Sequence, residues 1–240
     1  MSVPLTEGNA AKIYCLQFLD RLIEKSDRPL SVLDLGCGAG LNFKRLLERH
    51  PAVSYVGVEP SASGVEAARR SLAGLNAEVI HAPAYDVAQG PFDVVVSFSV
   101  LEHVYRRAAY MACARRNLRP GGRFLINYDA GHFVSPSIRD RVKNLVGPVL
   151  ARAGVERYYQ AFVSEAEFTA LVADAGFEIV EARSFNTALK GLARHVPPAG
   201  AEAFNEIWLH AEARLGDLLP PYDDAQAAVF RTRNFVLVPR

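Results

Sequence analysis

The chain has 240 residues, of which half are apolar and 22% are charged, and its formal net charge is +1. This balance is typical of a folded globular protein and gives no basic footprint for nucleic acid. The three cysteines, at positions 15, 37 and 113, are too scattered for a zinc site or a disulfide framework, so no metal is expected. No apolar run approaches the length of a membrane span and no signal peptide is evident, so we expect a cytoplasmic protein.

The first predicted strand leads into a glycine-rich turn. After a helix over 9–25, a short apolar strand is expected over 31–35 and a further helix over 41–50. Between them, Gly36, Gly38 and Gly40 offer backbone that can approach a ligand closely, as in the opening of a nucleotide-binding βαβ unit. A dinucleotide fingerprint would need its third glycine at the next position, where this chain has leucine. This departure disfavours a nicotinamide- or flavin-dependent oxidoreductase.

An acidic residue ends the next predicted strand, which covers 53–59. Glu59 lies 19 residues beyond Gly40, about where a Rossmann-type fold places the carboxylate that binds ribose hydroxyls. A solvated acid at a strand end is the alternative. A helix over 62–75 and a short strand over 78–81 follow.

The most apolar strand is predicted over 93–98, and its nearly continuous hydrophobic run is typical of a central parallel strand covered on both faces. A helix over 106–118 follows. Leu118-Arg-Pro-Gly-Gly122 then predicts a sharp turn before a fifth strand over 122–127. Farther along, a helix ending at Gly176, a strand from Phe177 and a last strand over 233–238 are expected.

Three of these stretches resemble landmarks of the class I S-adenosylmethionine-dependent methyltransferases. They are the D-x-G-x-G-x-G pattern over 34–40, the F-D-x-V strand that leads to a Glu-His pair over 92–103, and the L-x-P-G-G turn over 118–122. The resemblance covers roughly residues 30–128. It implies an α/β, Rossmann-like fold with a seven-stranded, mostly parallel sheet, helices on both faces and an antiparallel final strand. It also implies S-adenosylmethionine as the cofactor, with S-adenosylhomocysteine as the product.

The same resemblance implies positions for cofactor binding. Asp34 is expected to act through hydrogen bonds to the ligand ammonium or to ordered water, and Glu59 to accept from the ribose. Pro83 stands where the family places an acid for the adenine, so backbone near Ala84 or the ring of Tyr85 would replace it. The complete expected set is Tyr14, Asp34, Gly36, Cys37, Gly38, Gly40, Asn42, Glu59, Pro60, Ala84, Tyr85, Ser97, Phe98 and Ser99. For Tyr14, a packed aromatic ring is the alternative.

Two irregular segments interrupt the βα pattern, over 129–162 and 187–228. Regular βα connections have about 2–6 residues, so we expect these segments to be caps or lids within a single domain over 1–240. Both could fold over the carboxyl ends of the strands, where open α/β sheets bind ligands. Either could instead form a homodimer surface.

The predicted reaction is methyl transfer to an oxygen or nitrogen atom of a small molecule, such as a metabolite, natural product or sugar derivative. Ser97-Phe-Ser-Val replaces the Asn/Asp-Pro-Pro-Tyr of enzymes that methylate bases or glutamine, which disfavours those acceptors. His103 is the leading candidate for a general base, and His132 and Tyr128 are further acceptor-side candidates. His103 could equally orient its loop. A non-catalytic S-adenosylmethionine-binding protein or partner subunit is the competing function.

Overall fold

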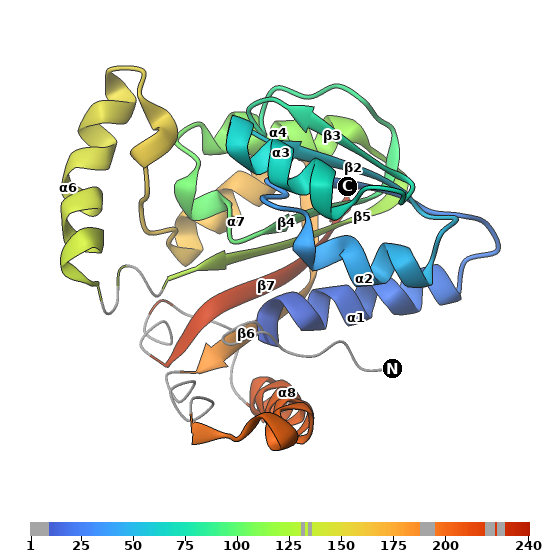
Figure 1. Ribbon diagram of the computed structural model, residues 1–240. Coiled ribbons are helices and arrows are strands. Elements are labelled where there is room, and N and C mark those ends of the chain that lie inside the picture. The colour runs from blue at the N-terminus through green and yellow to red at the C-terminus, as the bar shows by residue number, and fades with distance from the viewer. Residues whose placement is uncertain (1–9, 131–132, 134–135, 188–194, 219–223, 225–228) are drawn as a thin grey trace.

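The computed structural model describes residues 10–130, 133, 136–187, 195–218, 224 and 229–240. Its centre is a seven-stranded sheet with the order β3-β2-β1-β4-β5-β7-β6 (Figure 1). The strands are β1 (Ser31–Leu35), β2 (Ser54–Glu59), β3 (Ala77–His81), β4 (Phe92–Phe98), β5 (Leu118–Asp129), β6 (Phe177–Thr187) and β7 (Phe230–Pro239). β7 runs antiparallel to both of its neighbours, whereas β1 to β5 pair in parallel. The predicted fold class is confirmed.

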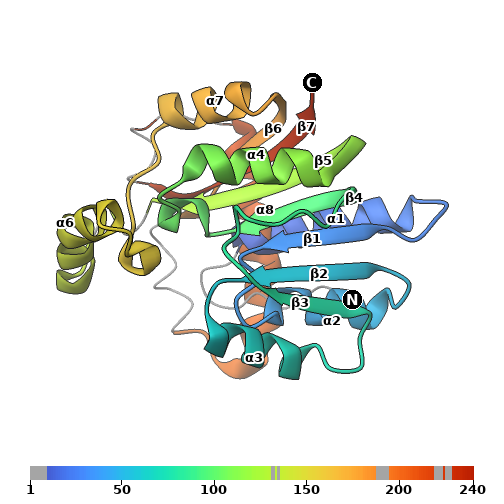
Figure 2. The same ribbon diagram turned by 90° about the horizontal axis from the view of Figure 1, so that it is seen from above.

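Helices cover both faces of the sheet, as Figure 2 shows. They are α1 (Ala10–Glu24), α2 (Leu41–Arg49), α3 (Ala62–Ser71), α4 (Arg107–Asn117), α6 (Ile138–Arg152), α7 (Glu165–Asp174) and α8 (Ala201–Leu218), with short 3-10 turns η1 (Leu101–His103), η2 (Glu156–Tyr158) and η4 (Pro198–Gly200). Leu19, Phe43 and Ala68 bring α1, α2 and α3 into one buried cluster. Tyr110 and Phe168 bring α4 and α7 into another on the opposite face.

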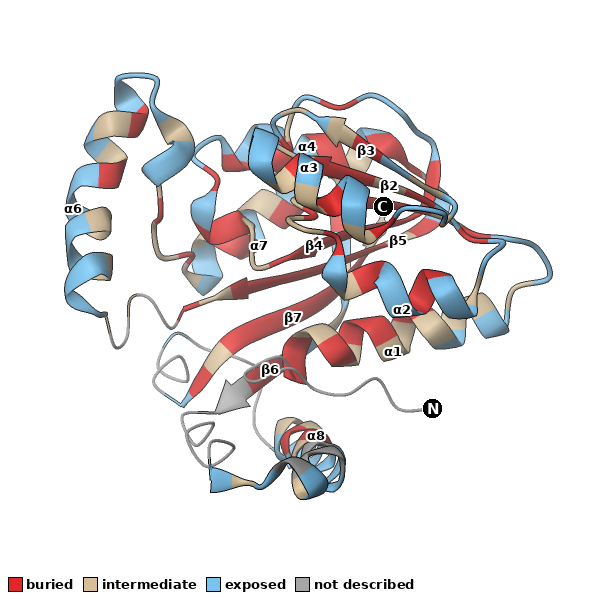
Figure 3. Cartoon of the chain, viewed as in Figure 1, coloured by how far each residue is buried: buried red, intermediate tan, exposed pale blue. Residues whose placement is uncertain are grey.

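The central strand β4 is buried at all seven positions because helices pack on both of its faces (Figure 3). This burial explains the continuous apolar run. The turn predicted over 118–122 is instead part of β5, which begins at Leu118. Leu118 pairs with Phe92 and Arg123 pairs with Val94, so the extra residues of β5 bulge out of the ladder at this point. Gly121, with φ of 76°, supplies the left-handed conformation that the bulge uses.

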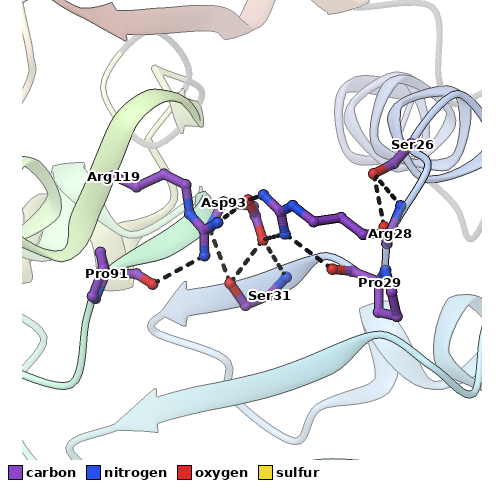
Figure 4. Close-up of polar contacts among 7 residues, drawn as sticks. All are labelled: Ser26, Arg28, Pro29, Ser31, Pro91, Asp93 and Arg119. Atoms are coloured by element: carbon purple, nitrogen blue, oxygen red, sulfur yellow. Dashed lines mark hydrogen bonds and ion pairs between the residues drawn. The ribbon is translucent and has the colours of Figure 1, made fainter.

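A buried carboxylate ties three strands together at their amino ends (Figure 4). Asp93 Oδ2 accepts hydrogen bonds from the backbone N–H of Ser31 at 2.9 Å and from its hydroxyl at 3.0 Å. Asp93 also forms ion pairs with Arg28 and Arg119. Burial by itself would raise the pKa of Asp93, but the hydrogen bonds from Arg28 and Ser31 and the charge of Arg119 lower it overall. The cluster therefore favours the ionised carboxylate and leaves the opposite, carboxyl edge of the sheet for ligands.

The two predicted insertions lie in different places. α6 and η2 stand beyond the carboxyl ends of β1 and β2, apart from the faces of the sheet (Figures 1 and 2). α8 packs against β6 and α1, where Leu209 joins a buried cluster with Ile13 and Phe185. Parts of the second insertion, 188–194, 219–223 and 225–228, lie outside the described residues. Within the described chain, no helix is long and apolar enough to span a membrane.

Candidate active site

A cavity of about 740 Å³ opens at the carboxyl ends of the parallel strands. Five segments line it: the glycine turn after β1, the end of β2, residues 83–85 after β3, the loop after β4, and residues 154–157 beyond α6. Its volume lies within the range of roughly 300–1,000 Å³ that is usual for small-molecule sites. Segments distant in sequence thus meet at the edge where doubly wound sheets bind ligands.

Glycine is required at the three positions of the turn for different structural reasons. All have left-handed backbone, with φ of 95° at Gly36, 56° at Gly38 and 72° at Gly40. A Cβ at Gly36 would lie 2.5 Å from Val100 Cγ2, and one at Gly40 would lie 2.8 Å from Leu72 Cδ1. A Cβ at Gly38 would meet nothing within 4 Å. Packing therefore requires the outer glycines, whereas the middle one presents bare backbone to open space.

Glu59 holds this turn against the end of β2. Its Oε2 accepts from the backbone N–H of Gly38 at 3.1 Å, and its Oε1 accepts from that of Ser61 at 2.9 Å. A carboxylate offers about four lone-pair sites, so two further donors can still bind. Glu59 and the adjacent Pro60 both line the cavity. Glu59 can therefore organise the turn and accept from a ligand at the same time.

Asp34 lies beneath the turn and is 2% exposed. Its Oδ2 accepts from the Tyr55 hydroxyl at 2.8 Å. Burial raises the pKa of Asp34 to about 7, although the Tyr55 hydrogen bond and the charge of Lys12 oppose the shift. A ligand cation placed beside this carboxylate would favour its ionised form.

The segment after β3 is tied to the first insertion. Pro83, Ala84 and Tyr85 line the cavity. The Tyr85 hydroxyl donates to Glu156 Oε2 at 3.1 Å, and Arg106 Nε donates to Glu156 Oε1 at 2.8 Å. These contacts hold η2 at the rim, so the first insertion contributes directly to the walls of the cavity.

His103 lines the same cavity as Gly36 and Glu59. Its side chain is exposed and its backbone N–H donates to the carbonyl of Val100 at 2.8 Å, which closes the η1 turn. Of the three predicted catalytic candidates, His103 is the one that the described structure brings beside the predicted cofactor residues. His132 lies outside the described residues.

Tyr14 and Tyr128 do not join this site. The Tyr14 hydroxyl donates to Glu181 on β6, and its ring packs 5.0 Å from that of Phe185. Tyr128 is 1% exposed, and its ring lies 5.1 Å from Phe168 and 5.9 Å from Phe235. Both rings pack against side chains of the last two strands and α7, and neither is among the residues that line the cavity.

Three other predicted positions, Cys37, Ser97 and Phe98, are buried and are not among the residues that line the cavity. Ser97 accepts a hydrogen bond from the Tyr110 hydroxyl, and Phe98 stacks 5.9 Å from Phe43. Cys37 is buried, and a Cβ at Gly57 would lie 2.8 Å from its Sγ. These three side chains contribute to the packing beneath the glycine turn and the end of β4.

Two predicted positions have polar or strained surroundings at the edge of the site. Ser99 has a left-handed φ of 58°, and its N–H donates to Asn127 Oδ1 at 3.0 Å. A positive φ at serine is uncommon and is typical of functional turns. Asn42 is half-buried in the first turn of α2.

The comparisons with known proteins agree with this geometry. A family model described as a methyltransferase domain matches residues 9–182. The trans-aconitate 2-methyltransferases of Methylobacterium nodulans and Azoarcus sp. are 26% and 28% identical to this chain, over 88% and 89% of its length and 87% and 88% of theirs. The S-adenosylmethionine-dependent methyltransferase of Mesorhizobium loti is 19% identical, covers 96% of this chain and 98% of its own, and superposes with a TM-score of 0.59.

The chain belongs to the methyltransferase-domain family. The predicted enzyme class, an S-adenosylmethionine-dependent methyltransferase, and the predicted cofactor are confirmed at the level of this family. The solved structure, at its low identity, supports the fold of the chain.

Sequence reasoning missed Glu102, which immediately precedes His103. This carboxyl group is 1% exposed, its Oε1 accepts from the backbone N–H of Asp129 at 3.1 Å, and its Oε2 has no hydrogen-bond partner among the residues that the structure describes. Burial raises the pKa of Glu102 to about 8, and the charge of Lys12 opposes the shift. The Glu-His pair belongs to the landmark over 92–103, but its spacing does not indicate that the glutamate is the buried member.

Proposed function

We propose that this methyltransferase transfers the methyl group of S-adenosylmethionine to an oxygen or nitrogen atom of a small-molecule acceptor. The observation that carries the proposal is one cavity lined by Gly36 of the glycine turn, the carboxylate of Glu59 and the imidazole of His103. Residues proposed to bind the cofactor and a candidate base therefore line one space.

The residues present fit the cofactor. Glu59 has acceptor capacity for the ribose hydroxyls, and the open space at Gly38 leaves room beside the turn. Asp34 would favour the ammonium group, because a buried carboxylate is stabilised in its ionised form by a nearby cation. Ala84 and Tyr85 line the cavity and would contact the adenine. When bound, the sulfonium supplies a methyl group that is already activated for displacement.

The remaining contribution of the chain is alignment and exclusion of water. The η2 segment closes one wall through the contacts of Glu156 with Tyr85 and Arg106. His103 lies where it could take a proton from an acceptor hydroxyl or ammonium, a contribution of typically 10²–10⁴-fold to the rate. An acceptor that is already ionised would need no such step.

A small acceptor is favoured by two observations. The relatives that match most of this chain are named for methylation of trans-aconitate, a small molecule. In addition, residues 97–100 lack the Asn/Asp-Pro-Pro-Tyr pattern of enzymes that act on bases or glutamine. The cavity of about 740 Å³ has room for a small acceptor beside the cofactor.

The test is transfer of a labelled methyl group from S-adenosylmethionine to a panel of small carboxylic acids, phenols, alcohols and amines. Methylated product that is lost in Glu59→Ala would support the proposal. If the protein binds the cofactor but transfers no label to any class of acceptor, the competing function, a non-catalytic binding protein or partner subunit, would take its place.

A further inference from the structure

Helix α6 presents its large apolar side chains to solvent. Ile138, Val142, Leu145 and Val149 recur at intervals of four, three and four residues, so they share one face of the helix. They are 83%, 57%, 76% and 64% exposed, and Val146 beside them is 42% exposed. In an ordinary surface helix such a stripe faces the core. We call these five residues the α6 stripe.

The face of α6 that packs on the protein is the opposite one. Gly147 lies nine residues after Ile138, which is half a turn around the helix axis, and it is buried together with Ala151. A Cβ at Gly147 would lie 2.5 Å from the carbonyl oxygen of Tyr158. Within the described part of the chain, α6 packs chiefly against η2, and Figures 1 and 3 show it standing apart with an exposed outer side. Small residues therefore face inward and large apolar residues face outward.

Basic residues border the α6 stripe on both sides. With 3.6 residues per turn, Arg141 and Arg152 lie along one border, and Arg139 and Lys143 lie along the other. The single acid in the helix, Asp140, accepts from the Ser137 hydroxyl at 2.6 Å in the N-terminal capping box. Four basic residues and one acid give α6 a formal charge of +3.

We propose that α6 docks on a membrane surface that carries anionic lipids. The helix would lie in the plane of the headgroups, with the α6 stripe buried among the acyl chains and the basic borders at the phosphates. An apolar face bordered by cations is the pattern of helices that lie at such an interface. Pairing of two α6 stripes across a two-fold axis would instead bring basic borders together, which is unfavourable.

Docking in this way would bring the rim of the cavity to about one helix diameter, roughly 10 Å, from the lipid surface, because residues 154–157 line the cavity and the η2 turn packs on the inward face of α6. The proposal depends on α6 alone and does not require the proposed methyl transfer.

The test is co-sedimentation of the full chain with vesicles, without cofactor. Vesicles of phosphatidylcholine with phosphatidylserine should bind the protein. Binding should be much weaker to vesicles of phosphatidylcholine alone, and also to the mixed vesicles at high salt. Leu145→Ser with Val149→Ser should abolish binding. Arg139→Gln with Arg141→Gln should weaken it by about thirty-fold, since each basic residue near such a surface contributes roughly a factor of five.

The matched control is Ile207→Ser on α8, which removes an apolar side chain that is 70% exposed on a helix elsewhere. It should bind vesicles as the unchanged protein does, and all variants should keep the same thermal unfolding. Failure of the unchanged protein to bind, or binding that survives Leu145→Ser with Val149→Ser, would overturn the proposal. So would a concentration-dependent dimer that these two substitutions dissociate in the absence of vesicle binding.

Discussion

The affinity of this protein for S-adenosylmethionine is predicted to rise as the pH increases from 6 to 7. Asp34 is buried beneath the glycine turn, and burial raises its pKa to about 7. If the ligand ammonium binds the ionised carboxylate, protonation of Asp34 competes with binding. With a raised pKa the proton is held more tightly in the free protein, so binding weakens as the pH falls below 7.

The size of this effect follows from the ionised fraction. A carboxyl group with a pKa of about 7 is roughly one-tenth ionised at pH 6 and about one-half ionised at pH 7. The apparent dissociation constant scales inversely with the competent fraction, so affinity should increase about fivefold over this interval. The interval lies below the usual α-amino pKa of about 7.7–8.0, so most of the ligand amine stays protonated throughout.

Isothermal titration calorimetry at both pH values measures this change, and buffers of different ionisation enthalpy measure the proton release, which should be about half a proton at pH 7. In Asp34→Asn, the amide oxygen can still accept from Tyr55 but cannot titrate. The pH dependence should therefore disappear in this variant. A dependence of the same size in Asp34→Asn, or stronger binding at pH 6, would refute the assignment of Asp34.

Three further predictions concern the glycine turn, His103 and Asp93. Gly38→Val and Gly74→Val each place a β-branched residue at a left-handed φ with open space around it, so each variant should lose about 1–2 kcal/mol of folding stability in urea titrations. Of the two, Gly38→Val alone should weaken cofactor binding, by at least about tenfold. If His103 is the base, His103→Ala should lower kcat by about 10²-fold or more in steady-state kinetics and leave cofactor affinity unchanged in calorimetry. Equal losses of kcat and of cofactor affinity would indicate that His103 orients its loop. Asp93→Ala should lower the free energy of unfolding at pH 7 by about 2–3 kcal/mol and leave cofactor affinity unchanged, and an unchanged urea midpoint would contradict this role. The contribution of Asp93 to stability is present above the unfolded pKa of about 3.9 and is lost as the pH falls through the lowered pKa of the folded state.

The sequence was sufficient to predict the backbone of the site because its local signals agree with one another. The apolar run of β4 and the spacing between Gly40 and Glu59 both reflect the parallel sheet, and the structure has the strands within a few residues of their predicted bounds. At Leu118, local turn chemistry and tertiary pairing disagree. The pairing with β4 keeps this residue in β5 despite the glycines that follow.

Side-chain direction was harder to predict, because periodicity identifies the face of a helix without saying what covers it. Tyr14 and Tyr128 are predicted to act in the site because of their positions near the carboxyl edge of the sheet, yet each ring packs against an aromatic side chain away from the cavity lining. The opposite occurs in α6, where the apolar residues recur with helical spacing but lie on the exposed face. The burial of Glu102 also depends on contacts between β5 and the loop after β4, which are distant in sequence.

The most direct test of this account is calorimetric titration with S-adenosylmethionine and S-adenosylhomocysteine of the unchanged protein, Glu59→Ala and Glu78→Ala. Glu78 is an exposed carboxylate on the neighbouring strand and controls for the loss of charge. Charge-assisted hydrogen bonds contribute roughly 1.5–3 kcal/mol each, so loss of two to the ribose should weaken binding at least about hundredfold in Glu59→Ala. Glu78→Ala should bind as the unchanged protein does. Equal affinity in all three proteins would contradict the assignment of the cofactor site to the cavity beside Glu59.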